Sequence, residues 1–389
     1  MEGDFIKIRK WLLPFSWIYR MVVSFRNQLF ELNILKSQSF SIPVIAVGNI
    51  TVGGAGKTPH VEFLIKTLQD KSKVAVLSRG YKRKSSGYVL ADENSTTELI
   101  GDEPFQMKQK FPNVHIAVDK NRCNGINRLT HDAETKDTDV ILLDDAFQHR
   151  YVKPGINILL VDYHRLIIYD EMLPAGRLRE PKEGKSRADI VIITKCPKDL
   201  KAIDYRVLTK SMNLFPYQEL FFTTIEYLPL KQMCGTEKID PEKLKDMNVL
   251  LLTGIASPKQ LLLDMEPRCA SITTLSYADH HRFKRSDEKK INTIFEAMPS
   301  PKIIITTEKD AARLNGLTLL SKEVTENTYV LPIEVRFMLD EEDKFKHKII
   351  SYVRKNSRNS ILAKSKDEHK SKNSNHTGDR PRTISFRNY

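Results

Sequence analysis

The chain has 389 residues, too many for one domain of average size, and about 150 residues per domain predicts two domains with a remainder. Its formal net charge of +13 lies mainly in residues 1–36 and 355–389, so no basic stripe marks the middle of the chain and no nucleic-acid partner is expected. The four cysteines lack metal-site spacing and follow no secretory signal, which argues against a zinc site and predicts a cytosolic location or a cytosolic membrane face.

The first segment, residues 1–36, mixes aromatic and aliphatic side chains with basic ones. Its apolar span Trp11–Val23 is interrupted by Pro14 and Arg20, and it is too short to cross a bilayer with about 30 Å of hydrocarbon. The mixture predicts an amphipathic helix that lies at a membrane surface. A helix folded back on the protein's own core is the alternative.

The next segment begins with the apolar run Ile42–Val47, which feeds a glycine-rich loop and then a helical stretch. The loop ends in Gly-x-Gly-Lys-Thr, although Thr51 stands where the common phosphate-loop pattern has glycine. Backbone amides of such a loop surround phosphate oxygens, Lys57 supplies charge to the β and γ phosphates, and the Thr58 hydroxyl can ligate Mg²⁺. The expected nucleotide-binding residues are Thr51, Val52, Gly53, Gly54, Ala55, Gly56, Lys57 and Thr58.

Further apolar runs alternate with helical stretches up to residue 215. Near-continuous Val, Ile and Leu runs indicate strands buried on both faces, and hence a mainly parallel sheet wrapped by helices. Residues 37–215 are therefore expected to form an α/β core of the P-loop NTPase type. The runs are Val74–Leu77, Val114–Val118, Val140–Leu143, Ile156–Val161 and Ile190–Thr194.

An acidic pair is predicted at the ligand edge of this sheet. Asp144 and Asp145 follow the run Val140–Leu143, and ligands bind at the carboxyl ends of strands in open α/β sheets. One of the two is expected to hold Mg²⁺ opposite Thr58, and the other to contact the substrate or the lysine. Two adjacent acids could also simply begin a solvated turn.

A second acidic pair, Asp102 and Glu103, precedes the helical stretch 105–111. Asp before Glu-Pro is typical of a helix cap. The same carboxylate could accept a proton, because a hydroxyl substrate must lose one as phosphoryl transfer proceeds.

Arginines stand in two loops after expected strands. Arg79 follows the run that ends at Leu77, and Arg177 and Arg179 lie in the loop 173–181. Forked, charge-assisted bonds from arginine suit phosphate or a phosphorylated substrate, although each arginine alone is as often part of a surface ion pair.

The rest of the chain predicts three further segments. Residues 216–245 read as a linker ribbon, residues 246–354 as a smaller α/β domain, and the polar, basic residues 355–389 as a disordered tail. His280 lies in the smaller domain beside Asp279, a pairing that by itself more often marks a loop hydrogen bond than a catalyst.

The ordered series of motifs resembles the tetraacyldisaccharide 4'-kinase family, the lipid A 4'-kinases, across about residues 40 to 315. In that family the loop has the same form at Thr51. The motifs are Gly48-Asn49, Gly54-Ala55-Gly56-Lys57-Thr58-Pro59, Ser78-Arg79-Gly80-Tyr81, Gly101-Asp102-Glu103-Pro104, Asp144-Asp145, Phe147-Gln148-His149, Leu173-Pro174-Ala175-Gly176, Leu178-Arg179-Glu180, Asp279-His280 and Thr307-Glu308-Lys309-Asp310.

The resemblance implies transfer of the γ-phosphate of ATP to the 4'-hydroxyl of a tetraacyldisaccharide 1-phosphate. It implies a peripheral enzyme on the cytoplasmic face of an inner membrane, with Mg²⁺ at Thr58, Asp144 and Asp145. Asp102 would be the base and His280 its orienting partner, with Lys57 also catalytic. The substrate-contacting residues that it implies are Arg79, Glu103, Asp145, Arg179 and Glu180.

Two other classes of protein stay open on the sequence alone. A membrane-associated ATPase switch uses a similar loop but carries a lysine where this chain has Val52, and a GTP switch needs an aspartate that Thr194-Lys195-Cys196-Pro197 lacks. A soluble small-molecule kinase would leave the segment 1–36 without a role. These absences favour an enzyme that uses ATP.

Overall fold

The computed structural model describes residues 6, 8–255, 258–314 and 317–357. Most of the larger half is one nine-stranded sheet, in the order β15-β8-β7-β6-β1-β5-β2-β4-β3. The seven inner strands from β8 to β4 are parallel, while β3 and β15 at the two edges are antiparallel to their neighbours. Its strands are β1 (Val44–Gly48), β2 (Val74–Ser78), β3 (Val89–Leu90), β4 (His115–Val118), β5 (Val140–Asp144), β6 (Ile156–Asp162), β7 (Ile190–Thr194), β8 (Glu219–Tyr227) and β15 (Ile333–Phe337).

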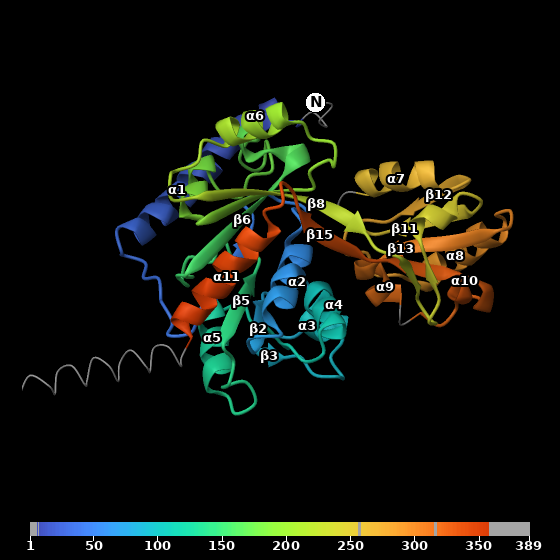
Figure 1. Ribbon diagram of the computed structural model, residues 1–389, viewed down its shortest axis with the longest axis horizontal. Coiled ribbons are helices and arrows are strands. Elements are labelled where there is room, and N and C mark those ends of the chain that lie inside the picture. Colours follow the sequence, from blue (N-terminus) through green and yellow to red (C-terminus); the bar gives the residue numbers. More distant parts are fainter. Residues whose placement is uncertain (1–5, 7, 256–257, 315–316, 358–389) are drawn as a thin grey trace, which may run out of the picture.

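Helices cover both faces of this sheet, so the expected α/β architecture is confirmed (Figure 1). The five apolar runs predicted as strands are β2, β4, β5, β6 and β7, with ends that differ by one residue at most. These strands are apolar along almost their whole length because helices cover both faces of the sheet. The helices of this half are α1 (Leu13–Glu31), α2 (Lys57–Leu68), α3 (Thr97–Ile100), α4 (Asp102–Lys110), α5 (Arg122–His131), α6 (Ala202–Met212) and α11 (Glu342–Asn356).

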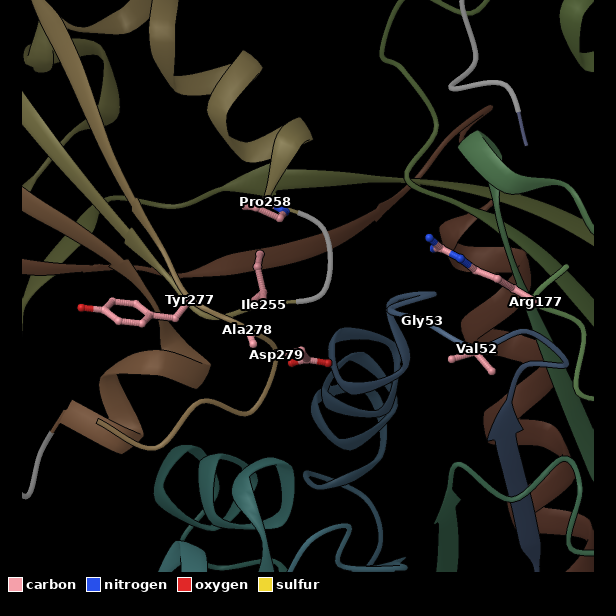
Figure 2. Close-up of a pocket in the computed structure, with 8 residues that line it drawn as sticks. All are labelled: Val52, Gly53, Arg177, Ile255, Pro258, Tyr277, Ala278 and Asp279. Carbon is pink, nitrogen blue, oxygen red and sulfur yellow. The ribbon is translucent and has the colours of Figure 1, made fainter. Parts of the chain in front are cut away.

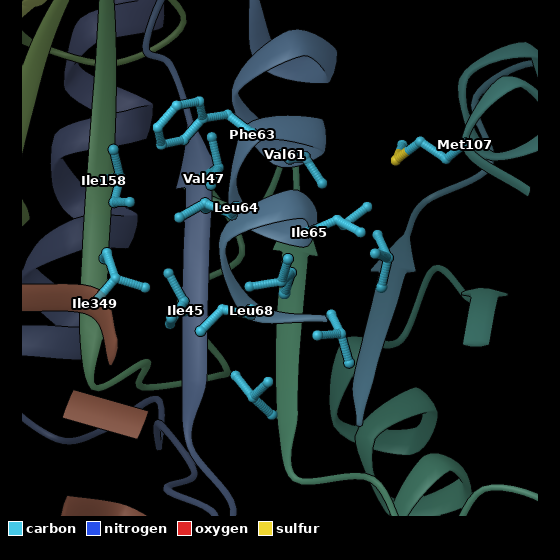
Figure 3. Close-up of a cluster of buried hydrophobic side chains, with 14 of the residues drawn as sticks. Ile45, Val47, Val61, Phe63, Leu64, Ile65, Leu68, Met107, Ile158 and Ile349 are labelled. Atoms are coloured by element: carbon cyan, nitrogen blue, oxygen red, sulfur yellow. The ribbon is translucent and has the colours of Figure 1, made fainter. Parts of the chain in front are cut away.

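Helix α2 anchors the phosphate loop to the main core. Its apolar positions recur at the spacing of one helical face, and this face packs on β1, β5 and β2 (Figure 3). The residues of that face are Val61, Leu64, Ile65 and Leu68, each 1% exposed or less.

The smaller half is a six-stranded sheet in the order β10-β9-β14-β13-β11-β12, with a parallel centre formed by β12, β11, β13 and β14. Its elements are β9 (Leu230–Gln232), β10 (Lys238–Ile239), β11 (Asn248–Thr253), α7 (Lys259–Met265), β12 (Ser271–Ser276), α8 (Arg285–Glu296), β13 (Lys302–Thr307), α9 (Glu308–Leu314), α10 (Lys322–Glu326) and β14 (Thr328–Leu331).

Strands β8 and β15 connect the two sheets as a two-stranded ribbon (Figure 1). After β14 the chain returns to the larger sheet, where α11 buries Phe345, Ile349 and Val353 in the main core. The sheets thus divide the chain after about residue 331, although the sequence placed everything from 246 to 354 in the smaller domain. The spacing of apolar residues in α11 indicates a buried helix face, but it does not reveal in which of the two cores that face is buried. The predicted disorder of the tail concerns residues that, beyond 357, lie outside the described part of the chain.

Helix α1 lies along the larger half and packs against it through one of its faces. Ser16 and Phe30 are buried, and Tyr19 and Val23 pack against the core. In the described residues, no helix combines the length and the apolar character that a membrane span requires.

Candidate functional site

The phosphate loop connects the end of β1 to the start of α2 at the carboxyl edge of the larger sheet. Gly48 approaches the next loop so closely that an added Cβ would lie 2.7 Å from the Cβ of Phe147. Gly56, which caps α2, has a φ of 81°, a left-handed conformation that favours glycine. These two glycines allow the turn that aims the backbone amides of a phosphate loop at an anion.

The Leu173–Glu180 motif braces this loop from one side. The backbone N–H of Val52 donates to the Arg177 carbonyl at 2.8 Å, and the N–H of Arg179 donates to the Ile50 carbonyl at 2.7 Å. Thr51 forms a β-bridge with Leu178. Thr51 is thus held in extended pairing, and this explains why the position does not need the glycine of the common pattern.

Lys57 belongs to a cluster of charges at the mouth of the loop. Its Nζ lies 3.5 Å from Oδ1 of Asp145 and donates to Oδ1 of Asn49 at 3.4 Å. Arg179 donates to the same two oxygens, at 3.2 Å and 2.5 Å. Burial acts to raise the pKa of Asp145, but the positive charges of Lys57 and Arg179 outweigh it and lower the pKa. Asp145 is therefore ionised and neutralises two cations.

Asp144 has the donor character of a cation ligand. It ends β5, beside β1, and is 5% exposed. Its Oδ2 accepts a hydrogen bond from the Ser78 hydroxyl at 3.0 Å, whereas its buried Oδ1 has no partner among the described residues. Burial, and next the charge of Asp145, raise the pKa of Asp144 to about 6. A buried carboxylate oxygen without a partner is costly unless a proton or a cation satisfies it.

The unpartnered Oδ1 of Asp144 is an oxygen donor of the kind that Mg²⁺ prefers. In nucleotide sites this ion is usually held by one or two protein oxygens, with phosphates and water completing the octahedron. The described part of the chain holds no group of three or more His, Cys, Asp or Glu side chains that could bind a metal ion.

Arg122 supports this corner and had no recognisable signal in the sequence. It is 2% exposed and donates to the carbonyls of Asp119 at 2.7 Å and Asp144 at 3.2 Å. Burial lowers its pKa to about 10, against the opposing charges of Asp144 and Asp145.

Asp102 and His280 meet across the two halves of the molecule. Nδ1 of His280 lies 2.8 Å from Oδ2 of Asp102, and Arg313 donates to the same oxygen at 2.6 Å and 3.1 Å. Burial acts to raise the pKa of Asp102, but the hydrogen bonds from His280 and Arg313 and the Arg313 charge bring it down to about 2. Asp102 is the first residue of α4, and the N-cap position is occupied by Gly101, so Asp102 is not the capping residue that the sequence suggested.

Further residues of α9 hold this pair in place. Lys309 lies 2.8 Å from Glu103 and donates to Asp279 at 3.2 Å, while its Nζ is 3.3 Å from Nε2 of His280. Buried Asp310 accepts a hydrogen bond from Arg313 at 3.0 Å. Sequence reasoning missed Arg313, because it belongs to no motif and stands 211 positions from Asp102.

Glu103 links the dyad to the sheet edge. Its charge is one of the causes that raise the pKa of Asp144, so the two carboxylates are close enough to interact. Asp279, which precedes His280, lines the same cavity as Val52 and Gly53, so the dyad lies near the phosphate loop.

Of the predicted substrate residues, Glu180 is buried and Arg79 is exposed. Glu180 is 2% exposed and accepts a hydrogen bond from Arg187 at 2.6 Å, so its carboxylate is already paired inside the protein. Arg79 is exposed at the end of β2, where its charge contributes to lowering the pKa of Arg122.

A cavity of about 470 Å³ separates the phosphate loop from the smaller half (Figure 2). Val52, Gly53 and Arg177 line it on one side, and residues at the ends of β11 and β12 line it on the other. The cavity is thus bounded by both halves of the molecule, as is the Asp102–His280 pair.

Comparisons with known proteins agree with this arrangement. The family model of the tetraacyldisaccharide-1-P 4'-kinases matches residues 8–354. A tetraacyldisaccharide 4'-kinase of Phocaeicola vulgatus is 56% identical over 363 residues, which cover 92% of this chain and 99% of the relative. Its namesake from Bacteroides thetaiotaomicron is 51% identical, covering 95% of this chain and all of the relative, 100%.

A solved structure resembles the whole described fold. It is a crystal structure of LpxK from Aquifex aeolicus in complex with ATP, with a TM-score of 0.67 and 29% sequence identity, covering 89% of this chain and 99% of that one. With a family match over nearly its whole length and close relatives of full coverage, the chain belongs to the tetraacyldisaccharide-1-P 4'-kinase family.

Proposed function

We propose that this protein transfers the γ-phosphate of ATP to the 4'-hydroxyl of a tetraacyldisaccharide 1-phosphate. The observation that carries the proposal is the Asp102–His280 contact of 2.8 Å, which joins the two halves of the molecule beside the phosphate loop. The close relatives named for this reaction and the ATP in the related crystal structure support it. The residues assigned below are part of the proposal.

Asp102 is the proton acceptor, and His280 orients it. The described contacts of its carboxylate from His280 and Arg313 all use Oδ2, so Oδ1 is the atom that we assign to the substrate hydroxyl. A carboxylate with a pKa of about 2 is a weak base. A weak base is sufficient where phosphoryl transfer passes through a loose transition state, because the attacking oxygen then needs little activation.

Lys57 binds the phosphates of ATP together with those amides between Thr51 and Thr58 that are not already hydrogen-bonded, as the amides of Val52 and Ala55 are. Asp144 and the Thr58 hydroxyl hold Mg²⁺, which when bound neutralises charge on the phosphates. Asp145 and Arg179 exchange their mutual ion pair for contacts with substrate or nucleotide. Arg79 and Glu103 contact the phosphorylated disaccharide, and Glu180 acts on it only indirectly, by fixing Arg187.

Helix α1 places the enzyme on the cytoplasmic face of an inner membrane. Its outward face carries large apolar side chains that are more than half exposed, interspersed with exposed basic residues such as Arg20. A helix of this kind lies in the headgroup boundary of a bilayer. The apolar residues are Phe15, Trp17, Ile18, Met21, Val22 and Phe25, and Trp11 is exposed in the short turn that precedes the helix.

The proposal is tested by transfer of labelled γ-phosphate from Mg-ATP to a tetraacyldisaccharide 1-phosphate in mixed micelles. Reactions without lipid and with a soluble disaccharide serve as controls. Label should appear only in the lipid product, and Asp102→Ala should cut turnover by roughly 10² to 10⁴ while nucleotide affinity is kept. Lipid-independent ATP hydrolysis with no labelled lipid would refute the kinase assignment.

A further inference from the structure

Three consecutive carbonyls of the phosphate loop, those of Gly54, Ala55 and Gly56, accept hydrogen bonds from side chains behind the loop. One of these donors, His60, belongs to no motif discussed above. In the same order, the donors are Nζ of Lys195, Oγ1 of Thr194 at 3.0 Å and Nδ1 of His60 at 2.7 Å.

These hydrogen bonds fix the directions of the three carbonyls and therefore the orientation of the peptide planes to which the carbonyls belong. Because the N–H and C=O of a trans peptide point in opposite directions, the amides of Gly56 and Lys57 are turned away from the brace. In the described part of the chain these two amides donate no hydrogen bond. They are the groups that a phosphate nest needs free for an anion.

His60 differs from the other two donors because it uses both ring nitrogens. A carbonyl can only accept, so Nδ1 carries the proton, and Nε2 accepts from the Thr223 hydroxyl at 3.1 Å. His60 and Thr223 are 3% and 1% exposed. In β8, Phe222 still pairs with β7, whereas Thr223 is the first residue to pair with β15. The imidazole therefore joins the loop to the root of the ribbon between the two sheets.

We propose that His60 is a positioning residue for nucleotide binding, which holds the Gly56 peptide in its phosphate-binding orientation and is itself held by Thr223. This inference rests on the proposed use of ATP. A histidine that only filled space in the core would affect stability alone. One that orients the Gly56 carbonyl affects nucleotide affinity through a single ring nitrogen.

Two substitutions separate the functions of the two nitrogens. The amide nitrogen of Asn in His60→Asn falls near Nδ1 and can still donate to the Gly56 carbonyl. The amide oxygen of Gln in His60→Gln falls near Nε2 and can still accept from Thr223, but it leaves Gly56 with only its long backbone bond of 3.3 Å from the His60 N–H. Thr67→Ala on the same helix is the matched control, since its hydroxyl donates to Phe63 at 2.8 Å and does not touch the loop.

The measurements are the Kd of Mg-ATP without lipid, by calorimetry, and the Tm of each variant. His60→Gln should bind nucleotide about 5- to 10-fold more weakly, as expected for the loss of one buried hydrogen bond, while His60→Asn and Thr67→Ala stay near the wild type. The two His60 variants should have similar Tm values. Equal affinities for both, or equal losses that follow Tm, would overturn the inference. If the wild type itself binds no nucleotide, the proposed function has failed instead.

Discussion

At the scale of single residues, the carboxylates of Asp102 and Asp144 differ in how well their partners compensate the free-energy cost of burial. Asp102 is ionised with two cationic or hydrogen-bonding partners, whereas Asp144 has one buried oxygen with none. A carboxylate of the second kind stores free energy that a ligand can release, because cation binding removes the cost of its burial.

Asp144→Asn should therefore stabilise the ligand-free protein and abolish phosphoryl transfer. The folded-state pKa of about 6 lies above the unfolded value of 3.8, so the folded state binds more protons between these values. Stability of the wild type thus falls as pH rises from about 3.8 through 6, and the penalty is complete above 6. At pH near 7.5 the variant should gain about 1 to 3 kcal/mol in free energy of unfolding, measured by urea denaturation. Millimolar Mg²⁺ with ADP should raise the Tm of the wild type more than that of the variant; equal rises would contradict a metal role for Asp144.

Arg313→Gln should impair the dyad without touching the phosphate loop. Loss of the cation raises the pKa of Asp102 from about 2 toward its usual range and frees its carboxylate to rotate. The lowered pKa of the wild type contributes stability that is present above about 3.8 and lost as pH falls toward 2, and the variant should lack this contribution. Turnover should fall by about one to two orders of magnitude, with the acid limb of the pH–rate profile moved upward and the Kd of ATP unchanged. Arg282→Gln, which removes an exposed ion pair with Glu98, is the control.

Residues such as Lys57 and Asp144 could be predicted because their chemistry is written in local motifs after apolar strands. The pairing of Asp102 with His280 came only from resemblance, since a dyad assembled from two sheets has no local pattern. Arg122 and Arg313 could not be predicted at all, because what gives them a role is a long-range contact and not a neighbouring residue.

At the scale of elements, α1 packs on the protein itself, as one of the two alternatives from its sequence had it, and still leaves an apolar face exposed. One face buries Ser16 and Phe30 against the larger half, and the opposite face exposes Trp17 by 71%, while Trp11 in the short turn before the helix is 73% exposed. The periodicity predicted a two-faced helix, but only the packing identifies which face remains outside.

Replacing the two tryptophans, Trp11→Ser with Trp17→Ser, should weaken vesicle binding without unfolding the protein. Each exposed indole would otherwise enter the headgroup boundary, and loss of both should reduce partitioning by at least about tenfold. Sedimentation with anionic vesicles measures the effect. Leu263→Ser on α7, an apolar residue exposed by 52% in the smaller half, is the matched control and should bind as the wild type does. Unchanged binding of the double variant would exclude α1 as the contact.

At the scale of the whole molecule, the residues that we propose as catalytic come from both halves, and the ribbon formed by β8 and β15 joins these halves. The sequence predicted a second α/β unit but not the return of the chain to the first sheet. An ion-pair cluster also ties the halves together: Lys110 on α4 lies 2.6 Å from Glu62 on α2 and 2.9 Å from Glu308 on α9.

Lys110→Met should lower turnover more than it lowers nucleotide affinity. The change leaves the mostly buried carboxylates of Glu62 and Glu308 facing each other without a cation, and their repulsion should loosen α9, which carries Arg313. We expect turnover to fall by roughly tenfold, with the Kd of ATP within about twofold of the wild type. Lys108→Met, two residues away on the same helix, is the control, because the Lys108 ammonium donates to the Pro112 carbonyl at 2.7 Å and to neither glutamate. A loss of nucleotide affinity equal to the loss of turnover would contradict this division of roles.

The inner face of α1 forms hydrogen bonds with residues 172–179, the segment that contacts the phosphate loop. Ser16 donates to the Met172 carbonyl at 3.0 Å and accepts from the Ala175 N–H at 3.0 Å, and the Tyr19 hydroxyl donates to the Arg179 carbonyl at 3.2 Å. A protein shortened by deleting residues 1–36 would therefore lose anchors of the phosphate loop together with the surface that we propose for lipid binding. Low activity of such a truncation would not show that membrane binding matters for activity, because the phosphate loop would be disturbed as well. Only substitutions confined to the outward face of the helix separate the two effects.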